Sequence, residues 1–370
     1  AKQLSGGSSF AGLPGATIVL GSAAASQLLS RFMVRFGRRA GLVLGYGIGA
    51  AGALAAGCAV VLSSFPLFIV ATAAMGCANA ANQLSRYTAA DMYPESGRAA
   101  AIGMVVWGST LGSIVGPNLV TLSGNIAEGF DLPRLAGVYG VPLLFVTAAA
   151  VLTLVTLRPD PASLAPASTA PSSGARASLG EMLTRPRIVA AVVALIIGQV
   201  VMVLVMTMTP LHMTEHGHDL TAVGLVISGH TFGMFALSPL SGRLAGRFGT
   251  PRVIAAGLAV SAFASALAAV APPDGGTLLF TALFLLGWGW NLGFVAGSAL
   301  LTEGLSGNER SRLQGATDAM IWSSAAAAAL GSGIVVAAAS YTALGLLGAL
   351  LIALPIATMV RGRRELRRSA

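Results

Sequence analysis

The sequence consists largely of apolar runs of about 20 residues, the length that a helix needs to cross the hydrocarbon core of a bilayer. Of its 370 residues, 55% are apolar and only 9% are charged, and the mean hydropathy is +0.79. The strict alternation of an outer-membrane barrel is absent. The 47 glycines favour the close helix approach that is typical of membrane bundles. We therefore predict an all-α polytopic membrane protein.

The apolar runs define eleven predicted membrane helices, separated by short polar or basic segments. They comprise residues 11–33, 41–63, 66–90, 99–123, 135–157, 187–211, 221–243, 252–271, 277–302, 312–338 and 340–360.

An internal repeat relates the two halves of the chain. Adding 212 to the residue number pairs Arg35-Phe36-Gly37 with Arg247-Phe248-Gly249, Gly21 with Gly233, and Asn79 with Asn291. The helix predicted at 187–211 has no partner at this offset. Because transporters are often built from such repeats, we expect the intact protein to contain twelve helices in two six-helix bundles. The first helix would then be absent from this chain.

The repeat and the composition predict three parts. Residues 1–157 form an N-terminal helical bundle that lacks its first helix, and residues 187–370 form a C-terminal bundle with a basic cytoplasmic tail. The stretch 158–186, which is rich in Pro, Ala and Ser, is predicted to be a cytoplasmic linker.

The distribution of basic residues predicts the orientation in the membrane. Of the 22 Lys and Arg residues, nineteen fall in one alternate set of loops and the tail, against Lys2 and Arg134 on the other side. Because basic loops stay in the cytoplasm, we expect both termini of the intact protein there, in a bacterial inner membrane. Basic residues placed in this way give no indication of nucleic-acid binding.

The loop after the second helix of each half carries a motif. Ser30-x-Phe32-x-x-Arg35-x-Gly37-Arg38-Arg39 and Gly242-x-Leu244-x-x-Arg247-x-Gly249 resemble the G-x-L-x-D-R-x-G-R-R loop of the major facilitator superfamily. The resemblance implies the major facilitator fold, two six-helix bundles with pseudo-twofold symmetry, of which eleven of twelve helices are present. It also implies gating loops at Arg35, Gly37, Arg38, Arg39, Arg247 and Gly249. Both copies replace the motif's aspartate, with Val34 and Gly246.

Methionine and histidine are concentrated in one region. All four histidines and five of the twelve methionines lie between Met202 and Met234. Thioether and imidazole ligands select soft or borderline metals such as copper. Met202-x3-Met206 and His230-x3-Met234 lie on successive predicted helices, and residues four apart share a helical face. A four-ligand metal site at Met202, Met206, His230 and Met234 is one prediction; ordinary packing of these side chains is the alternative.

These two motifs are similar to the MxxxM and HxxxM pair of the CcoA-type copper importers. The resemblance implies import of copper by alternating access, supplying haem-copper oxidase assembly. Because the four ligands are neutral and charge is costly within a bilayer, we expect the bound ion to be Cu(I). The implied partners are the copper ion as substrate, the lipid bilayer and periplasmic or cytoplasmic copper chaperones. We expect a monomer with no prosthetic group.

The segment from Leu211 to Asp219 is predicted to be an outer loop. It contains three histidines, a methionine and two acids at the mouth of the predicted pathway. Two interpretations remain open: a site that collects metal at His212, Met213, His216 and His218, or a solvated loop without a specific ligand, since ordering a loop costs entropy.

Several polar residues lie within predicted membrane helices. On the fourth helix of the intact protein, Asn79, Asn82, Gln83 and Arg86 form one stripe, with Asp91 beyond it. The stripe must face the bundle interior or a wet cavity, because facing lipid would be costly. Arg86 and Asp91 are predicted to pair in gating or coupling, with a structural polar network as the alternative.

Two further polar residues are candidates for a cavity or coupling role. Gln199 shares a face with Met202 and could line the pathway. Asp318 is a candidate proton carrier, or a structural partner of Arg312.

Three functions therefore compete. The first is copper import, the second is transport of a small organic molecule such as a drug or metabolite, and the third is a metal sensor that transports nothing. The sequence contains no catalytic constellation, nucleotide-binding loop or H-E-x-x-H motif, so we do not expect an enzyme.

Overall fold

The computed structural model describes residues 13–164, 178–272 and 276–359. Within these ranges the regular secondary structure is helical, and eleven helices or broken helices are long and apolar enough to cross a membrane. The predicted all-α membrane fold is thus confirmed. The basic tail and the middle of the predicted linker lie outside the described residues.

The helices of the first half follow one another with short connections. They are α2 (Leu13–Phe36), α3 (Arg38–Val61), α4 (Phe65–Asp91), the short η1 (Glu95–Gly97), α5 (Arg98–Gly129), α6 (Arg134–Val138), α7 (Gly140–Thr156) and α8 (Pro161–Leu164).

The second half repeats this order with one additional long helix at its start. It comprises α9 (Leu179–Met182), α10 (Pro186–Glu215), α11 (Leu220–Phe235), α12 (Ser238–Phe248), α13 (Thr250–Val270), α14 (Gly276–Leu300), α15 (Gly307–Ala338) and α16 (Tyr341–Leu351).

Contacts divide the described residues into two compact units. The first unit draws on Ala1–Met92, Leu111–Thr169 and Ser306–Ser323, and the second on Tyr93–Thr110, Ala170–Leu305 and Ser324–Ala370. The first part of α15 therefore packs with the first unit, and the first part of α5 with the second. The division at residues 157 and 187 that the sequence predicts assigns all of α5 to the first half and all of α15 to the second, so it does not include this exchange of helix segments.

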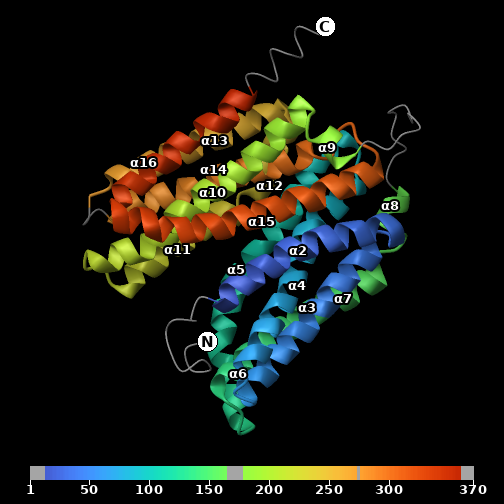
Figure 1. The fold of residues 1–370 in the computed structure, drawn as a ribbon, viewed down its shortest axis with the longest axis vertical. Coiled ribbons are helices and arrows are strands. Elements are labelled where there is room, and N and C mark those ends of the chain that lie inside the picture. The colour runs from blue at the N-terminus through green and yellow to red at the C-terminus, as the bar shows by residue number, and fades with distance from the viewer. Residues whose placement is uncertain (1–12, 165–177, 273–275, 360–370) are drawn as a thin grey trace. The chain divides into compact units, whose positions relative to one another are not determined.

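Small residues bring the helices of the first unit together. In Figure 1, α2, α3, α4 and α7 run alongside one another, and α4 packs on both α2 and α3. At Gly49 of α3 and Gly76 of α4, a Cβ atom would collide with the backbone of the neighbouring helix. The predicted close approach through glycine therefore occurs at these two crossings.

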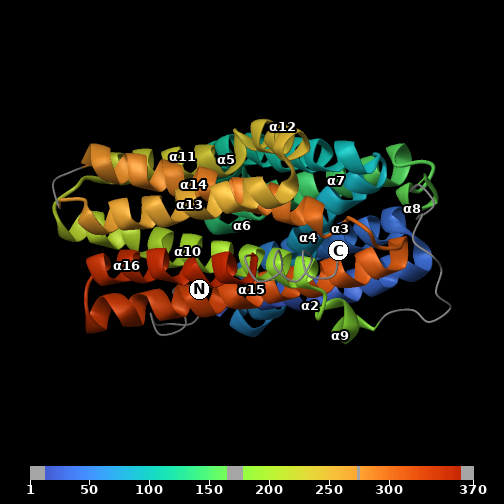
Figure 2. The ribbon, with the colours of Figure 1, turned by 90° about the horizontal axis from the view of Figure 1, so that it is seen from above.

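In the second unit, α14 is the central helix. It packs against α13, α11 and α10, whereas α10 and α11 make few contacts with each other. Figure 2 shows α13 beside α14, and α10 beside α16. At Gly287 of α14, a Cβ atom would meet the backbone of α11 at His230 and Met234. The helices that carry the predicted metal ligands are thus both held by α14.

The span predicted as 221–243 is broken between α11 and α12. Pro239 occupies the first turn of α12 and cannot donate a hydrogen bond to the preceding turn. Asn291 of α14 donates its Nδ2 to the Met234 carbonyl oxygen at 2.6 Å and to Ser238 Oγ at 2.7 Å. The carbonyl that the break releases is therefore satisfied inside the bundle, as a membrane interior requires.

The C-terminal end of α10 differs from the prediction. The helix continues to Glu215, so that His212 and Met213 lie in its last turn rather than in an outer loop. Pro210 does not stop the helix. The loop that follows is correspondingly short, since α11 begins at Leu220.

Candidate functional site

The four predicted copper ligands lie in the second unit, on α10 and α11. Met202 and His230 are buried, while Met206 and Met234 are half-buried. Because α10 and α11 each pack more extensively on α14 than on any other helix, the two motifs belong to helices that share a neighbour. The four-ligand site stays a prediction.

His230 has a defined orientation. Its Nδ1 lies 2.8 Å from the Leu283 carbonyl oxygen of α14. The side chain is 1% exposed, and its Nε2 is buried without a hydrogen-bond partner among the described residues. A backbone contact of this kind fixes the imidazole ring and leaves the other nitrogen for a ligand.

The outer histidines do not form one cluster. The His212 and His216 rings lie 4.4 Å apart, and His212 stacks on Tyr341 at 4.2 Å. Met213 is buried and His218 lies against Gly276. Within the described ranges, no three His, Cys, Asp or Glu side chains are arranged to hold a metal ion. Metal collection here stays a prediction that requires rearrangement.

An aromatic cluster joins α10, α11 and α14. Trp290 stacks on Phe294 with ring centroids 4.5 Å apart, and Phe235 meets Trp290 edge-on at 6.2 Å. Trp290 Nε1 donates to Gln199 Oε1 at 2.8 Å. Gln199 is buried and pairs with this indole, rather than standing as an isolated polar group near Met202. Trp288 Nε1 is buried and has no hydrogen-bond partner in the part of the chain that the structure describes.

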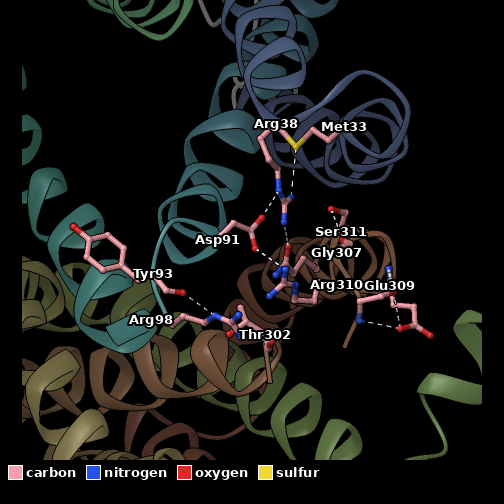
Figure 3. Close-up of polar contacts among 12 residues, drawn as sticks. Met33, Arg38, Asp91, Tyr93, Arg98, Thr302, Gly307, Glu309, Arg310 and Ser311 are labelled. Atoms are coloured by element: carbon pink, nitrogen blue, oxygen red, sulfur yellow. Dashed lines mark hydrogen bonds and ion pairs between the residues drawn. The ribbon is translucent and has the colours of Figure 1, made fainter. Parts of the chain in front are cut away.

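A charged cluster lies in the first unit. Figure 3 shows Arg38 between Asp91 and the sulfur of Met33, with Arg310 of α15 on the other side of Asp91. Arg38 Nε donates to Asp91 Oδ2 at 2.8 Å, and Arg310 Nη2 lies 3.4 Å from Asp91 Oδ1. Arg38 Nη2 also donates to Gln314 Oε1 at 2.8 Å. The cluster connects the loop motif to α4 and α15.

The predicted pairing of Arg86 with Asp91 is wrong. Arg86 Nη2 instead forms an ion pair with Asp318 Oδ1 at 2.6 Å, and both side chains are 2% exposed. Asp318 likewise pairs with Arg86 rather than with Arg312. Positions 86 and 91 are five residues apart on α4, which places them on different faces of the helix. Each therefore finds a partner on another helix.

The rest of the polar stripe is only partly buried. Asn79 Nδ2 donates to Ser22 Oγ at 3.0 Å, and Gln83 Oε1 accepts from Arg86 Nη1 at 3.1 Å. Asn82 is exposed. The stripe thus combines interhelical hydrogen bonds with one accessible amide.

Both loop glycines have the same backbone conformation. Gly37 has φ +91° and Gly249 has φ +87°, a left-handed region that favours glycine. Each lies between two helices, α2 and α3 or α12 and α13. Arg35 and Arg247 are exposed, and their guanidinium groups lie over Phe36 and Phe248 respectively.

The first loop has a helix cap from a distant residue. The Asp160 carboxylate accepts from the backbone N–H of Arg38 at 3.1 Å and from that of Arg39 at 2.9 Å. Two amide groups at the start of α3 are thereby satisfied. A Cβ at Gly37 would collide with this carboxylate.

The second loop, in the second unit, has a different set of partners. Thr250 stands where the offset places Arg38, and its Oγ1 donates to Glu303 Oε1 at 3.0 Å. Arg187 Nη2 approaches Glu303 Oε2 at 2.6 Å. A cavity of about 280 Å³ adjoins these residues and Glu95. Nearby, Arg98 Nη1 donates to the Thr302 carbonyl oxygen at 2.7 Å, as Figure 3 shows.

A larger, apolar cavity lies in the first unit. Its volume is about 720 Å³, and α3, α5, α6, α7 and the connection between α5 and α6 line it with side chains such as Leu54, Leu122 and Phe130. It contains no ionisable pair or polar cluster that suggests solute recognition.

Sequence reasoning missed Gln314 and Tyr87, which join the charged network through hydrogen bonds to Arg38 and Asp318, and it missed the buried Thr317 on the same helix as Gln314. Arg310, Gln314 and Asp318 are spaced four residues apart, which puts them on one face of a helix. This spacing was a usable signal. It was missed because the helix was predicted to begin at 312 rather than at Gly307.

Comparisons with known proteins agree with the fold. The sequence profile of the Major Facilitator Superfamily matches residues 1–223 and 202–369. The chain is 38% identical over 377 residues to the uncharacterized MFS-type transporter YddS of Bacillus subtilis, covering 100% of this chain and 86% of that protein. It is 30% identical over 365 residues to the riboflavin transporter RfnT of Brucella anthropi, covering 97% and 88%.

A solved structure shares the architecture. The E. coli fucose:proton symporter FucP superposes with a TM-score of 0.76 at 17% identity, covering 98% of this chain and 92% of that one. The resemblance drawn from the loop motif is confirmed at the level of the superfamily, and the narrower one to CcoA-type copper importers stays a prediction. The chain belongs to the major facilitator superfamily of membrane transporters.

Proposed function

We propose that this protein is a secondary transporter of a planar heteroaromatic solute in the bacterial inner membrane, with riboflavin as the first solute to test. The relative RfnT, similar over 97% of this chain, is named a riboflavin transporter. This relationship favours the organic-solute hypothesis over the metal hypotheses.

The observation that carries the proposal is the aromatic cluster of the second unit. Trp290 and Phe294 form a buried stack with an interplanar angle of 16°. Aromatic rings of this kind bind planar heterocycles by offset stacking. His230 Nε2 and Trp288 Nε1, which have no hydrogen-bond partner among the described residues, lie on α11 and α14, two helices that contribute to the cluster. In the proposed site they would make the few hydrogen bonds that orient a ligand in an apolar environment.

Riboflavin uptake by cells or proteoliposomes tests the proposal. Trp290→Ala removes the central ring, and loss of about 1.4 kcal/mol of stacking corresponds to a roughly tenfold rise in KM. Trp290→Phe should recover part of the affinity. Phe263→Ala, which truncates an aromatic side chain on α13 that is 60% exposed, is the matched control and should transport like the parent.

Two results would overturn it. One is a parent protein that is inserted in the membrane but neither takes up nor exchanges riboflavin. The other is equal loss of transport in Trp290→Ala and Phe263→Ala, which would indicate a general packing defect.

Copper import is the second candidate, favoured by the buried Nε2 of His230 and by Met234 one helical turn away. Cellular copper uptake should fall in His230→Ala, Met202→Ala, Met206→Ala and Met234→Ala if the four residues bind copper. Unchanged uptake in all four variants, at equal protein level, would refute it. If copper binds to the purified protein but is not transported into vesicles, the result would support the third hypothesis, a metal sensor that transports nothing.

A further inference from the structure

Between Gln314 and Asp318 of α15, three buried polar atoms lack a hydrogen-bond partner among the described residues: Gln314 Nε2, Thr317 Oγ1 and Asp318 Oδ2. Gln314 and Thr317 are 0% exposed and Asp318 is 1% exposed. Each unsatisfied buried group costs about 1–3 kcal/mol, so three together are unusual.

The three residues share one face of the helix. Their spacing of three and four residues places their side chains next to one another along α15. Internal water molecules satisfy such groups where several polar atoms converge. We therefore expect water along this face of the first unit, between Gln314 and Asp318.

The two ends of this face are charged. At one end, Gln314 Oε1 accepts from Arg38, which pairs with Asp91. At the other end, Asp318 Oδ1 accepts from Arg86 Nη2 at 2.6 Å and from the Tyr87 hydroxyl at 3.5 Å. The face thus connects the charged cluster of the loop motif to an ion pair inside the membrane-spanning region.

Asp318 is arranged to bind a proton. Only Oδ1 is held by Arg86 and Tyr87, so a proton can add to Oδ2 without displacing either group. The charged groups nearby are Arg86 and Asp91 of α4, Arg38 of α3 and Arg310 of α15. Together with Asp318, these groups comprise three positively charged arginines and two negatively charged aspartates. Protonation of Asp318 leaves Arg86 uncompensated, a state that is costly unless the helices rearrange.

We propose that Asp318 is the proton-binding group of this transporter, with Arg86 as its counterion, and that protons reach it through water along Gln314 and Thr317. Proton binding then changes the ion pair between α4 and α15, which provides the coupling to a conformational change. The proposal rests on transport by this chain but not on the identity of the solute.

A hydrophobic carbodiimide tests the proton site without any solute. The reagent adds to protonated carboxyl groups in apolar surroundings, and mass spectrometry of the purified full chain locates the adduct. Asp318 should be modified at acidic pH and progressively less at alkaline pH. Asp91 is the internal control, because it is similarly buried but forms ion pairs with two guanidinium groups, those of Arg38 and Arg310, whereas Asp318 pairs with Arg86. No modification of Asp318 at any pH, or equal modification of Asp91, would overturn the proposal.

Transport with riboflavin as the probe supplies the second test. In proteoliposomes with an imposed pH gradient, Asp318→Asn should lose the accumulation of riboflavin that the gradient drives. Exchange of riboflavin with the same pH on both sides of the membrane should decrease less. Asp318→Glu should restore part of the accumulation, and Thr317→Val should slow it. Equal loss of both activities in Asp318→Asn would indicate a structural role. A parent that does not move riboflavin refutes the proposed function, while the carbodiimide result still decides the proton site.

Discussion

The two copies of the loop motif differ where Arg38 of the first is replaced by Thr250 in the second, and this difference changes the charge around the neighbouring carboxylate. Asp91 is neutralised by two buried guanidinium groups, those of Arg38 and Arg310. Its counterpart in the repeat, Glu303, accepts a hydrogen bond from the Thr250 hydroxyl and forms an ion pair with Arg187, whose side chain is 56% exposed. Burial raises the pKa of Glu303, although the hydrogen bond from Thr250 and the charge of Arg187 lower it.

The raised pKa of Glu303 predicts a pH dependence of stability. The folded state binds this proton more tightly than the unfolded state, so the contribution to stability is full below the ordinary glutamate pKa. It is lost as the pH rises through the raised pKa. We expect thermal melting of the detergent-solubilised protein to show this decline, and Glu303→Gln to lack it. Glu95→Gln, in the same cavity, should retain the decline but move it to lower pH, because the charge of Glu95 contributes to the raised pKa of Glu303. Complete loss of the decline in Glu95→Gln would contradict the assignment to Glu303.

Arg86 shows which part of the site could be predicted from the sequence. Helical spacing predicted correctly that Arg86 shares a stripe with Gln83, since the two side chains are hydrogen-bonded. It could not give the partner, because Asp318 is 232 positions further along the chain. Such pairing depends on how α15 packs against α4, and local periodicity carries no information about that.

At the level of elements, helix positions were predictable and their ends were not. Hydropathy found each membrane span, because length and apolarity are what a bilayer requires. Pro239 was the missed signal for the break between α11 and α12. The repeat places Gln27 at the same position of α2, which continues unbroken from Leu13 to Phe36. By contrast, α10 passes through Pro210, so a proline alone does not decide the outcome.

The contact of α11 with α14 leads to a prediction at Gly287. A Cβ there would meet the His230 carbonyl oxygen and the Met234 nitrogen. Because backbone atoms cannot move aside easily, Gly287→Ala should destabilise the protein by about 1–3 kcal/mol. Gly293→Ala, on the same helix with nothing within 4 Å, is the control. It should be neutral or stabilise the protein by up to about 1 kcal/mol, through helix propensity.

Melting temperatures in detergent compare the two variants. Equal stability of Gly287→Ala and Gly293→Ala would contradict the close approach of α11 and α14. Transport by Gly287→Ala provides a second measurement, since His230 and Leu283 lie at the same crossing.

For the whole molecule, the repeat and the loop motif predicted the fold that the superfamily match confirms. The orientation in the membrane remains a prediction from the basic residues. It can be tested with single cysteines in a chain whose Cys58 and Cys77 are replaced by alanine. His216→Cys should react with an impermeant maleimide on intact cells, whereas Ser96→Cys should react only after permeabilisation. Both positions are exposed, so the reverse pattern would show the opposite orientation.

The apolar cavity of the first unit has a practical consequence for handling the purified protein. Its walls are mostly leucine, isoleucine, valine and phenylalanine, and the hydroxyl groups of Ser123 and Tyr139 are too few to hold a cluster of water in place. Hydrocarbon tails are therefore the natural filling, whether they come from a lipid or from a detergent. Shelf life and melting temperature should depend on the tail length and bulk of the chosen surfactant, and retained phospholipid should act as a stabilising additive.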